Sequence, residues 1–346
     1  MSILTSSVLL NAYVETFETD GTYEGEYIKL LAKTFKSNFG ELDKKIDFGS
    51  LDDDKDIRLD EISKYFKSEF SGAWKEAKKF AVSEILNLIK EDLHNFNIIH
   101  DHWFSESSLG TVEDVESDLS KSLKTIKNQG YTYSKDGAEW FKTTEFGDDK
   151  DRVLLRENKE PTYYLTDVGY HKNKIDRNFD AYINIFGADH HGYIPRLTAA
   201  FDVMKKEHQN IEFLLYQLVN LYEEGVKKTM STRRGEYFSL NDLREDLGPD
   251  VIKFFFLEKK SDHPMDFDID LAKDESKNNP YFYAQYAYVR CCSILAKASF
   301  DPSVEIDLNE IENCYEITSK AINYPLILQE YALERSPHSL VHFIKD

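Results

Sequence analysis

The stretch INIFGADHHGYIPRLTAA, from Ile183 to Ala200, decides how the fold is interpreted. The short apolar run Tyr182–Phe186 is consistent with a buried parallel strand, and Pro195 suits the first turn of a helix over Arg196–Lys206. Residues that join a parallel strand to the following helix lie at the carboxyl edge of the sheet, where open α/β sheets bind ligands. The sequence therefore predicts a binding site within residues 187–193.

The adjacent histidines His190 and His191 are poor candidates for a metal site. Neighbouring side chains on an extended chain point to opposite sides, and helical metal pairs are usually four residues apart. The three cysteines of the chain are too few and wrongly spaced for zinc. From these residues alone two interpretations stay open, a ligand-binding turn and an ordinary turn whose histidines are satisfied by neighbouring groups.

Composition bounds the class of protein. With 346 residues the chain can bury a sizeable core in more than one domain, and a hydrophobic content of 41% is ordinary for a globular protein. The formal net charge of −20 argues against a membrane-surface binder and, taken alone, against a nucleic-acid binder, although one face can still be basic. Three cysteines, two of them adjacent, form no disulfide framework, so we expect a reduced, cytoplasmic protein without a membrane span.

Periodicity predicts helices before this stretch and a hairpin close to it. Helical spacing of apolar residues is found in three segments, residues 21–40, 58–96 (a helix pair) and 112–127. The acidic segment 41–60 is poor in apolar residues and is predicted to be a surface loop. The stretch YTYSKDGAEWFKTTEF (131–146) alternates around Asp136-Gly137, which predicts a β-hairpin.

The segments after the hairpin mix strands and helices. The stretch RVLLRENKEPTYYLTDVGYH (152–171) gives two strand candidates around Pro161, and residues 211–221 give another. From Asn241 onward nearly every segment has a helical pattern. We therefore expect an α/β unit that carries a helical insertion and is followed by a helical bundle.

Several segments closely resemble the bacterial arginyl-tRNA synthetases, beginning with GADHHGYIPRLTAA (187–200) itself. The others are GEYIKLLA (25–32), DHWFSESSL (101–109), EWFKTTEFGDDKDRVLLR (139–156), PTYYLTDVGYH (161–171), LLYQLVNLYEEG (214–225), MSTRRGEYFSL (230–240), MDFDIDLAKDESKNNPYFYAQYAYVR (265–290) and SPHSLVHFIKD (336–346). They occur in order over essentially the whole chain, and their combination is specific.

The resemblance implies a class I aminoacyl-tRNA synthetase, a ligase of protein biosynthesis. Such an enzyme activates L-arginine with ATP and Mg²⁺ and transfers it to the 3′ end of tRNA-Arg. The implied fold is α/β, with a Rossmann-like catalytic domain over residues 1–265 that carries a helical insertion at about 41–130. An all-α anticodon-binding domain is implied over residues 266–346. The resemblance also implies a monomer without a structural metal.

Tyr163 and Asp167 match the arginine-binding pair of the family, a tyrosine and an aspartate four residues apart after Pro-Thr. A carboxylate is the best partner for the planar, always charged guanidinium because the two groups can form a bidentate fork. If this segment starts as a strand, the even spacing places both side chains on one face. An exposed aspartate at a strand end is the alternative that the residues alone leave open. The resemblance adds His190 to the arginine pocket.

The resemblance also implies ATP-binding and catalytic roles for the turn and for a downstream loop. The implied ATP-binding residues are Gly187, Asp189, His191, Gln217 and Met230. The loop TMSTRR (229–234) stands where class I enzymes carry Lys-Met-Ser-Lys-Ser, with Thr229 and Thr232 at the two lysine positions. The work of this loop is electrostatic, because its cations stabilise charge that develops on the phosphates. The implied catalytic residues are Met230, Ser231, Thr232 and Arg233.

The His-Ile-Gly-His signature of class I enzymes does not occur in the printed sequence. We therefore expect a chain truncated at both ends that does not charge tRNA alone and that exposes an apolar sheet edge. Three other interpretations stay open: a non-catalytic tRNA-binding fragment, another class I synthetase, and a nucleotide-binding α/β protein without a tRNA partner.

Overall fold

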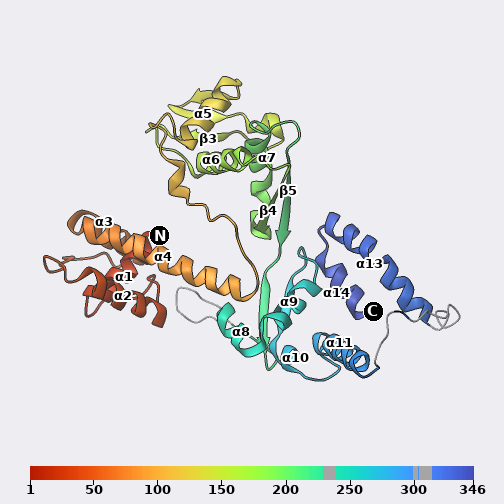
Figure 1. The fold of residues 1–346 in the computed structure, drawn as a ribbon. Coiled ribbons are helices and arrows are strands. Elements are labelled where there is room, and N and C mark those ends of the chain that lie inside the picture. The colour runs from red at the N-terminus through yellow and green to blue at the C-terminus, as the bar shows by residue number, and fades with distance from the viewer. Residues whose placement is uncertain (229–237, 299–302, 304–313) are drawn as a thin grey trace.

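The computed structural model describes residues 1–228, 238–298, 303 and 314–346. Its first region is a unit of four helices, coloured red to orange in Figure 1. The helices are α1 (Ser2–Tyr13), α2 (Glu26–Phe39), α3 (Lys55–Glu69) and α4 (Ser71–Asn95). They share one apolar core around Leu9, Ile28 and Phe66, which are at most 1% exposed. The predicted helix over 21–40 and the predicted helix pair over 58–96 are confirmed.

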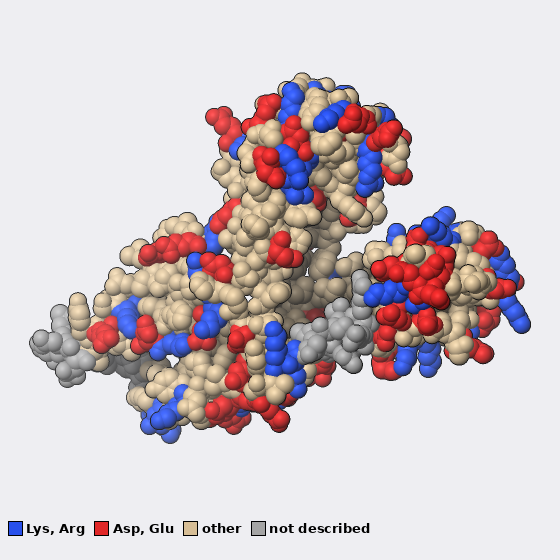
Figure 2. All heavy atoms as spheres, turned by 180° about the vertical axis from the view of Figure 1, so that it is seen from behind, with Lys and Arg blue, Asp and Glu red and all other residues tan. Residues whose placement is uncertain are grey.

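The predicted loop over 41–60 ends earlier than expected, because α3 begins at Lys55. The side chain of Asp54 accepts hydrogen bonds from the backbone N–H groups of Asp56 and Ile57 and so caps the helix. Figure 2 shows a dense group of acidic side chains on this helical lobe, so part of the negative charge of the chain is concentrated there.

A second unit is built around a small antiparallel sheet. Its order is β1-β2-β3, from β1 (Thr132–Lys135), β2 (Ala138–Phe141) and β3 (Arg152–Leu155). The predicted hairpin is confirmed, with Lys135 paired to Ala138 across the turn. The helix predicted over 112–127 begins later than expected, since Ser117 caps α5 (Asp118–Asn128) by accepting from the N–H of Ser120. The short helices η1 (Glu106–Leu109) and η2 (Thr143–Phe146) complete this unit.

The second strand candidate around Pro161 is wrong, because the segment after Pro161 is the helix α6 (Tyr163–Asp176). Thr162 starts this helix: its Oγ1 accepts a hydrogen bond from the N–H of Leu165 at 3.3 Å. Apolar residues then recur at helical rather than alternating spacing, and Leu165 and Val168 are fully buried.

The predicted strand, turn and helix around residues 183–200 are confirmed. Strand β4 (Ala181–Gly187) leads through η3 (Ala188–Tyr193) into α7 (Ile194–Asp202), which has proline in its first turn. Strand β4 pairs in parallel with β5 (Asn210–Tyr216), and these two strands form the whole described sheet.

The expectation that β4 is buried is only half right. Tyr182 and Asn184 are buried, whereas Ile183 and Ile185 on the opposite face are 41% and 65% exposed. A strand in a two-stranded sheet that is covered on one face has alternating burial, so the apolar side chains of the other face are exposed.

A third region follows β5. Residues 211–221, predicted as one strand, belong to two, since β5 ends at Tyr216 and β6 (Val219–Glu223) joins another sheet. That sheet has the order β7-β6-β8, from β7 (Val226–Lys227), β6 and β8 (Met265–Asp268). The helices α8 (Leu240–Leu247), α9 (Pro249–Glu258) and α10 (Ile269–Lys273) pack around it. The prediction of nearly continuous helix after Asn241 missed β8, whose short alternation of buried Met265 and Phe267 reflects pairing with a distant strand.

The last region is helical, as predicted, and is coloured blue in Figure 1. Its described helices are α11 (Pro280–Lys297), α13 (Tyr315–Leu333) and α14 (Pro337–Lys345). Helix α14 packs against α9, and Lys345 forms an ion pair with Glu258 there. Among the described residues no helix combines the length and the apolar character needed to cross a bilayer.

Candidate functional site

Helix α6 carries Tyr163 and Asp167, the two residues predicted to bind arginine. They share one side of α6 because residues four apart lie on the same helical face. The segment is a helix rather than the expected strand, and a spacing of four residues places both side chains on one face in either structure. Their surroundings differ, since Tyr163 is 84% exposed and Asp167 is half-buried.

A cavity of about 310 Å³ opens beside Asp167, between α6 and the segment that precedes η1. Its lining residues are His100, His102, Trp103, Phe104, Glu106, Leu109, Thr166, Asp167 and Tyr170. Two carboxylates, Glu106 and Asp167, therefore reach the cavity from different elements, and three aromatic rings form much of its wall. Such a cavity suits a cation that carries an apolar stem.

The environment of the cavity changes the pKa of Asp167. Burial raises the pKa of Asp167, and the charge of Glu106 raises it further, while the cations of Arg196 and Lys174 act in the opposite direction. A cation bound in the cavity would relieve the repulsion between the carboxylates. Glu106 was not predicted as a site residue, although it lies within the quoted segment DHWFSESSL.

Arg196 connects this cavity to the start of α7. Its guanidinium lies 4.2 Å from the centre of the Tyr193 ring, and the hydroxyl of Tyr164 donates a 2.7 Å hydrogen bond to its backbone carbonyl. Helix α6 is thereby attached to the helix that follows the GADHHG turn. Helix α7 thus contacts both α6, which lines the cavity, and the η3 turn.

The GADHHG turn is exposed. Asp189, His190 and His191 are all accessible to solvent, and His190 Nε2 lies 3.6 Å from an oxygen of Asp189. The ring of His190 stacks on Phe186 with centroids 6.0 Å apart. A Cβ atom at Gly187 would lie 2.6 Å from an Asp189 carboxylate oxygen, so a larger residue here would displace the exposed Asp189 side chain. His190 does not line the cavity beside Asp167.

Other predicted residues lie farther along the chain. The backbone N–H of Gln217 donates to the carbonyl of Ser261 at 2.8 Å, and its side chain is half-buried between β5 and β6. Met230, Ser231, Thr232 and Arg233 lie outside the described residues. Within the part of the chain that the structure describes, no group of three His, Cys, Asp or Glu side chains could hold a metal ion.

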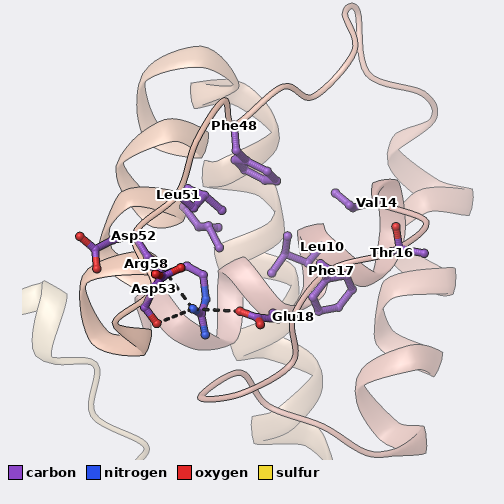
Figure 3. Close-up of a pocket in the computed structure, with 11 residues that line it drawn as sticks. Leu10, Val14, Thr16, Phe17, Glu18, Phe48, Leu51, Asp52, Asp53 and Arg58 are labelled. Atoms are coloured by element: carbon purple, nitrogen blue, oxygen red, sulfur yellow. Dashed lines mark hydrogen bonds and ion pairs between the residues drawn. The ribbon is translucent and has the colours of Figure 1, made fainter.

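A second cavity, of about 240 Å³, lies in the helical unit between the end of α1 and α3 (Figure 3). Arg58 on its wall is only 8% exposed and forms a 2.9 Å ion pair with Glu18. The same guanidinium donates to the backbone carbonyls of Asp52 and Asp53. Its contacts fix the acidic loop onto α3, so we assign Arg58 a structural role.

Comparisons with known proteins agree on one family. The profile of the DALR anticodon binding domain matches residues 284–346. The arginine–tRNA ligase of Vesicomyosocius okutanii is 41% identical over 360 residues that include 100% of this chain. The arginine–tRNA ligase of Bacillus subtilis is 40% identical over 274 residues, or 78% of this chain. The chain belongs to the arginyl-tRNA synthetase family.

Solved structures of arginyl-tRNA synthetases have the same fold. The crystal structure of one from Campylobacter jejuni matches 99% of this chain with a TM-score of 0.78 and 28% identity. A Thermus thermophilus structure matches with a TM-score of 0.67 at 15% identity, which supports the fold alone. The chain covers 71% of the first structure, 61% of the V. okutanii protein and 49% of the B. subtilis protein.

Proposed function

We propose that this chain carries the arginine-selecting and tRNA-binding parts of an arginine–tRNA ligase. In that reaction ATP activates L-arginine, with release of diphosphate, and the arginyl group passes to the 3′ end of tRNA-Arg with release of AMP. The observation that supports this best is the cavity beside α6, where Glu106 and Asp167 meet within aromatic walls. Family membership supplies the reaction.

Asp167 and Glu106 would bind the guanidinium of arginine. The guanidinium presents five N–H donors in a plane, so one carboxylate can accept a bidentate pair while the second accepts from the remaining edge. The rings of Trp103 and Tyr170 would cover the aliphatic stem. A lysine side chain fills fewer of these acceptors, so it would leave an oxygen of the half-buried Asp167 carboxylate without its charged partner, which disfavours lysine. Tyr163 would act at the exposed end of this site.

ATP with Mg²⁺ would bind at the carboxyl edge of β4 and β5. We assign Gly187, Asp189, His190, His191 and Gln217 to this region because they follow the two parallel strands. The arginine carboxylate would attack the α-phosphorus there, and diphosphate would leave. The family motif assigns the neutralisation of phosphate charge to the loop of Met230, Ser231, Thr232 and Arg233.

The helical region would bind tRNA-Arg. We keep the predicted division, with a catalytic domain over 1–265 that carries an insertion at about 41–130 and an anticodon-binding domain over 266–346. The DALR match over 284–346 supports the second domain. The acidic lobe of α1–α4 would then face away from the nucleic acid (Figure 2). We further propose that the protein acts in the cytoplasm as a monomer.

Calorimetric titration of the chain with L-arginine and L-lysine tests the arginine site. We expect arginine to bind more tightly than lysine, and Asp167→Asn to weaken arginine binding about 10- to 100-fold, as expected for a lost charged hydrogen-bonding partner. Asp176→Asn is the matched control, because Asp176 lies at the surface on the same helix and its ion pair among the described residues is with Lys172. Equal affinities of the unaltered chain and Asp167→Asn would overturn the assignment.

A further inference from the structure

A series of three hydrogen bonds, buried in its middle and partly buried at both ends, runs behind Asp167. Lys174 Nζ lies 2.5 Å from Asn184 Oδ1, and Asn184 Nδ2 lies 3.2 Å from His171 Nε2. His171 Nδ1 lies 2.8 Å from the backbone carbonyl oxygen of Asp167. His171 and Asn184 are 3% and 5% exposed, so water does not replace the contact between them. These hydrogen bonds join α6, which carries Lys174 and His171, to Asn184 on β4.

The donor and the acceptor of each hydrogen bond follow from the chemistry of the side chains. Lysine only donates, so the Asn184 atom that faces Lys174 must be the amide oxygen. The amide nitrogen of Asn184 then donates to His171 Nε2, which must carry a lone pair. His171 therefore carries its proton on Nδ1 and donates it to the carbonyl of Asp167, which can only accept. Every polar atom along the path has one defined role.

The ionisation of the buried residues is consistent with this arrangement. Burial and, to a smaller extent, the neighbouring charge of Lys174 lower the pKa of His171 to about 4, against the opposing effect of the hydrogen bond to the backbone of Asp167, so the imidazole is neutral near pH 7. Burial, followed by the charge of Arg177, lowers the pKa of Lys174 to about 8, while Asp167 acts in the opposite direction. Lys174 is still mostly protonated at pH 7.

Lys174, the first member of this series of hydrogen bonds, also contacts the cavity wall. The ammonium of Lys174 lies 4.5 Å from the centre of the Tyr170 ring, and Tyr170 and Asp167 both line the cavity. The turn of α6 that bears the carboxylate is thus attached to β4, three residues before the turn that begins at Gly187.

We propose that Lys174, Asn184 and His171 are positioning residues, which hold the Asp167 turn of α6 in register with β4 and thereby set the affinity for arginine. This inference rests on the proposed function of the cavity. These three hydrogen bonds, which we call the relay, keep the carboxylate of Asp167 at a fixed distance from β4. The end of β4 leads to the proposed nucleotide region. None of the three residues needs to touch the substrate.

The first test determines which ring nitrogen of His171 carries the proton. Long-range ¹H–¹⁵N correlation spectra of the chain at pH 7 should show His171 as the Nδ1–H tautomer, which is the less common form of a free imidazole. The signal is assigned by its absence in His171→Gln. An Nε2–H tautomer or a doubly protonated ring would overturn the relay, and this measurement needs no stable variant of Asn184 or Lys174.

The second test measures arginine binding. Asn184→Asp replaces the amide donor with an acceptor, so His171 must carry a proton on Nε2, and we expect the lone Nδ1–H tautomer to be replaced by an Nε2–H or a doubly protonated ring, together with an about tenfold weaker affinity for arginine. Lys174→Met removes the first donor and should weaken binding to a similar extent. Asn173→Ala is the matched control on α6, because Asn173 bonds to Asp118 and Arg177 outside the relay, and its affinity should stay within about twofold.

The outcomes separate the two proposals. If the unaltered chain binds arginine and Asn184→Asp binds it equally well, the positioning role is overturned while the arginine site stands. If the unaltered chain does not bind arginine, the proposed function fails, and with it the effect on affinity, even where the Nδ1–H tautomer is found. Weakened binding in Asn184→Asp and Lys174→Met, but not in Asn173→Ala, supports the relay.

Discussion

Acidification should destabilise the protein through His171. Burial beside Lys174 lowers the pKa of His171 from 6.5 to about 4 in the folded state. The unfolded chain therefore binds the proton more readily between these two values. The stabilisation from the neutral ring is fully present above pH 6.5 and is lost as the pH falls toward 4. The difference between 6.5 and about 4 corresponds to about 3 kcal/mol of unfolding free energy.

Urea unfolding of the chain and of His171→Gln, each between pH 7 and pH 4, measures this loss. His171→Gln should be less stable at pH 7, because the relay is damaged, but it should lose about 3 kcal/mol less than the unaltered chain on acidification. Subtracting one stability curve from the other cancels the contributions of the carboxylates that both proteins contain. Asp167 is one of them, and its raised pKa stabilises the folded state on acidification. His208 is exposed, and His208→Gln serves as a control. Its loss of unfolding free energy between pH 7 and pH 4 should equal that of the unaltered chain.

Parallel stability curves for the unaltered chain and His171→Gln would refute the reasoning. They would mean that His171 takes up its proton equally readily in the folded and unfolded states. A neutral, donating imidazole could then not be maintained below pH 6.5, and the hydrogen-bond direction assigned to Asn184 would lose its support.

Two further substitutions test how α6 is built, each by urea unfolding. Thr162→Ala should cost about 1–2 kcal/mol, because Thr162 caps α6 through the N–H of Leu165 and also bonds to the preceding strand; an unchanged midpoint would contradict this. Gly169→Val should cost about 1–3 kcal/mol, since a Cβ at Gly169 would lie 2.9 Å from a methyl group of Leu119. Gly72→Ala, a helical glycine with nothing within 4 Å, should be neutral or stabilising, and an equal loss in both glycine variants would exclude crowding as the cause.

Local chemistry explains the parts of the fold that the sequence predicted well. The Asp136-Gly137 turn requires positive φ at both residues, and the observed values of 50° and 75° match a type I′ hairpin. Pro195 fixes the start of α7 by its own ring geometry. These signals act within a few residues, so no knowledge of the tertiary structure is needed to interpret them.

The errors fall where tertiary packing or an overlooked cap decides the structure. The segment after Pro161 was predicted as a strand, whereas Thr162 caps a helix there. Strand β8 is four residues long and pairs with β6, whose residues lie more than forty positions earlier in the chain. A short strand with so distant a partner has no local signal that separates it from the adjoining helices.

The candidate site was predicted only in part for a related reason. Asp167 could be selected because a motif places it after Pro-Thr. Glu106 is one of 63 acidic residues, and only the packing of η1 against α6 brings it to the same cavity. Asn184 and Lys174 meet because β4 lies against α6, a contact that no periodicity in either segment predicts.

The Tyr163–Asp167 pair shows which conclusions survive a wrong secondary structure. Four residues is an even spacing, so a strand places both side chains on one face, and it is also close to one helical turn, so a helix does the same. The solvent exposure of each side chain, in contrast, differs between a strand and a helix and does not follow from the spacing. Tyr163 is the first residue of α6, about 6 Å along the helix axis from Asp167. The arginine stem would need to extend toward that end of α6 for Tyr163 to contact it, so the direction of the bound stem decides whether this tyrosine takes part in recognition.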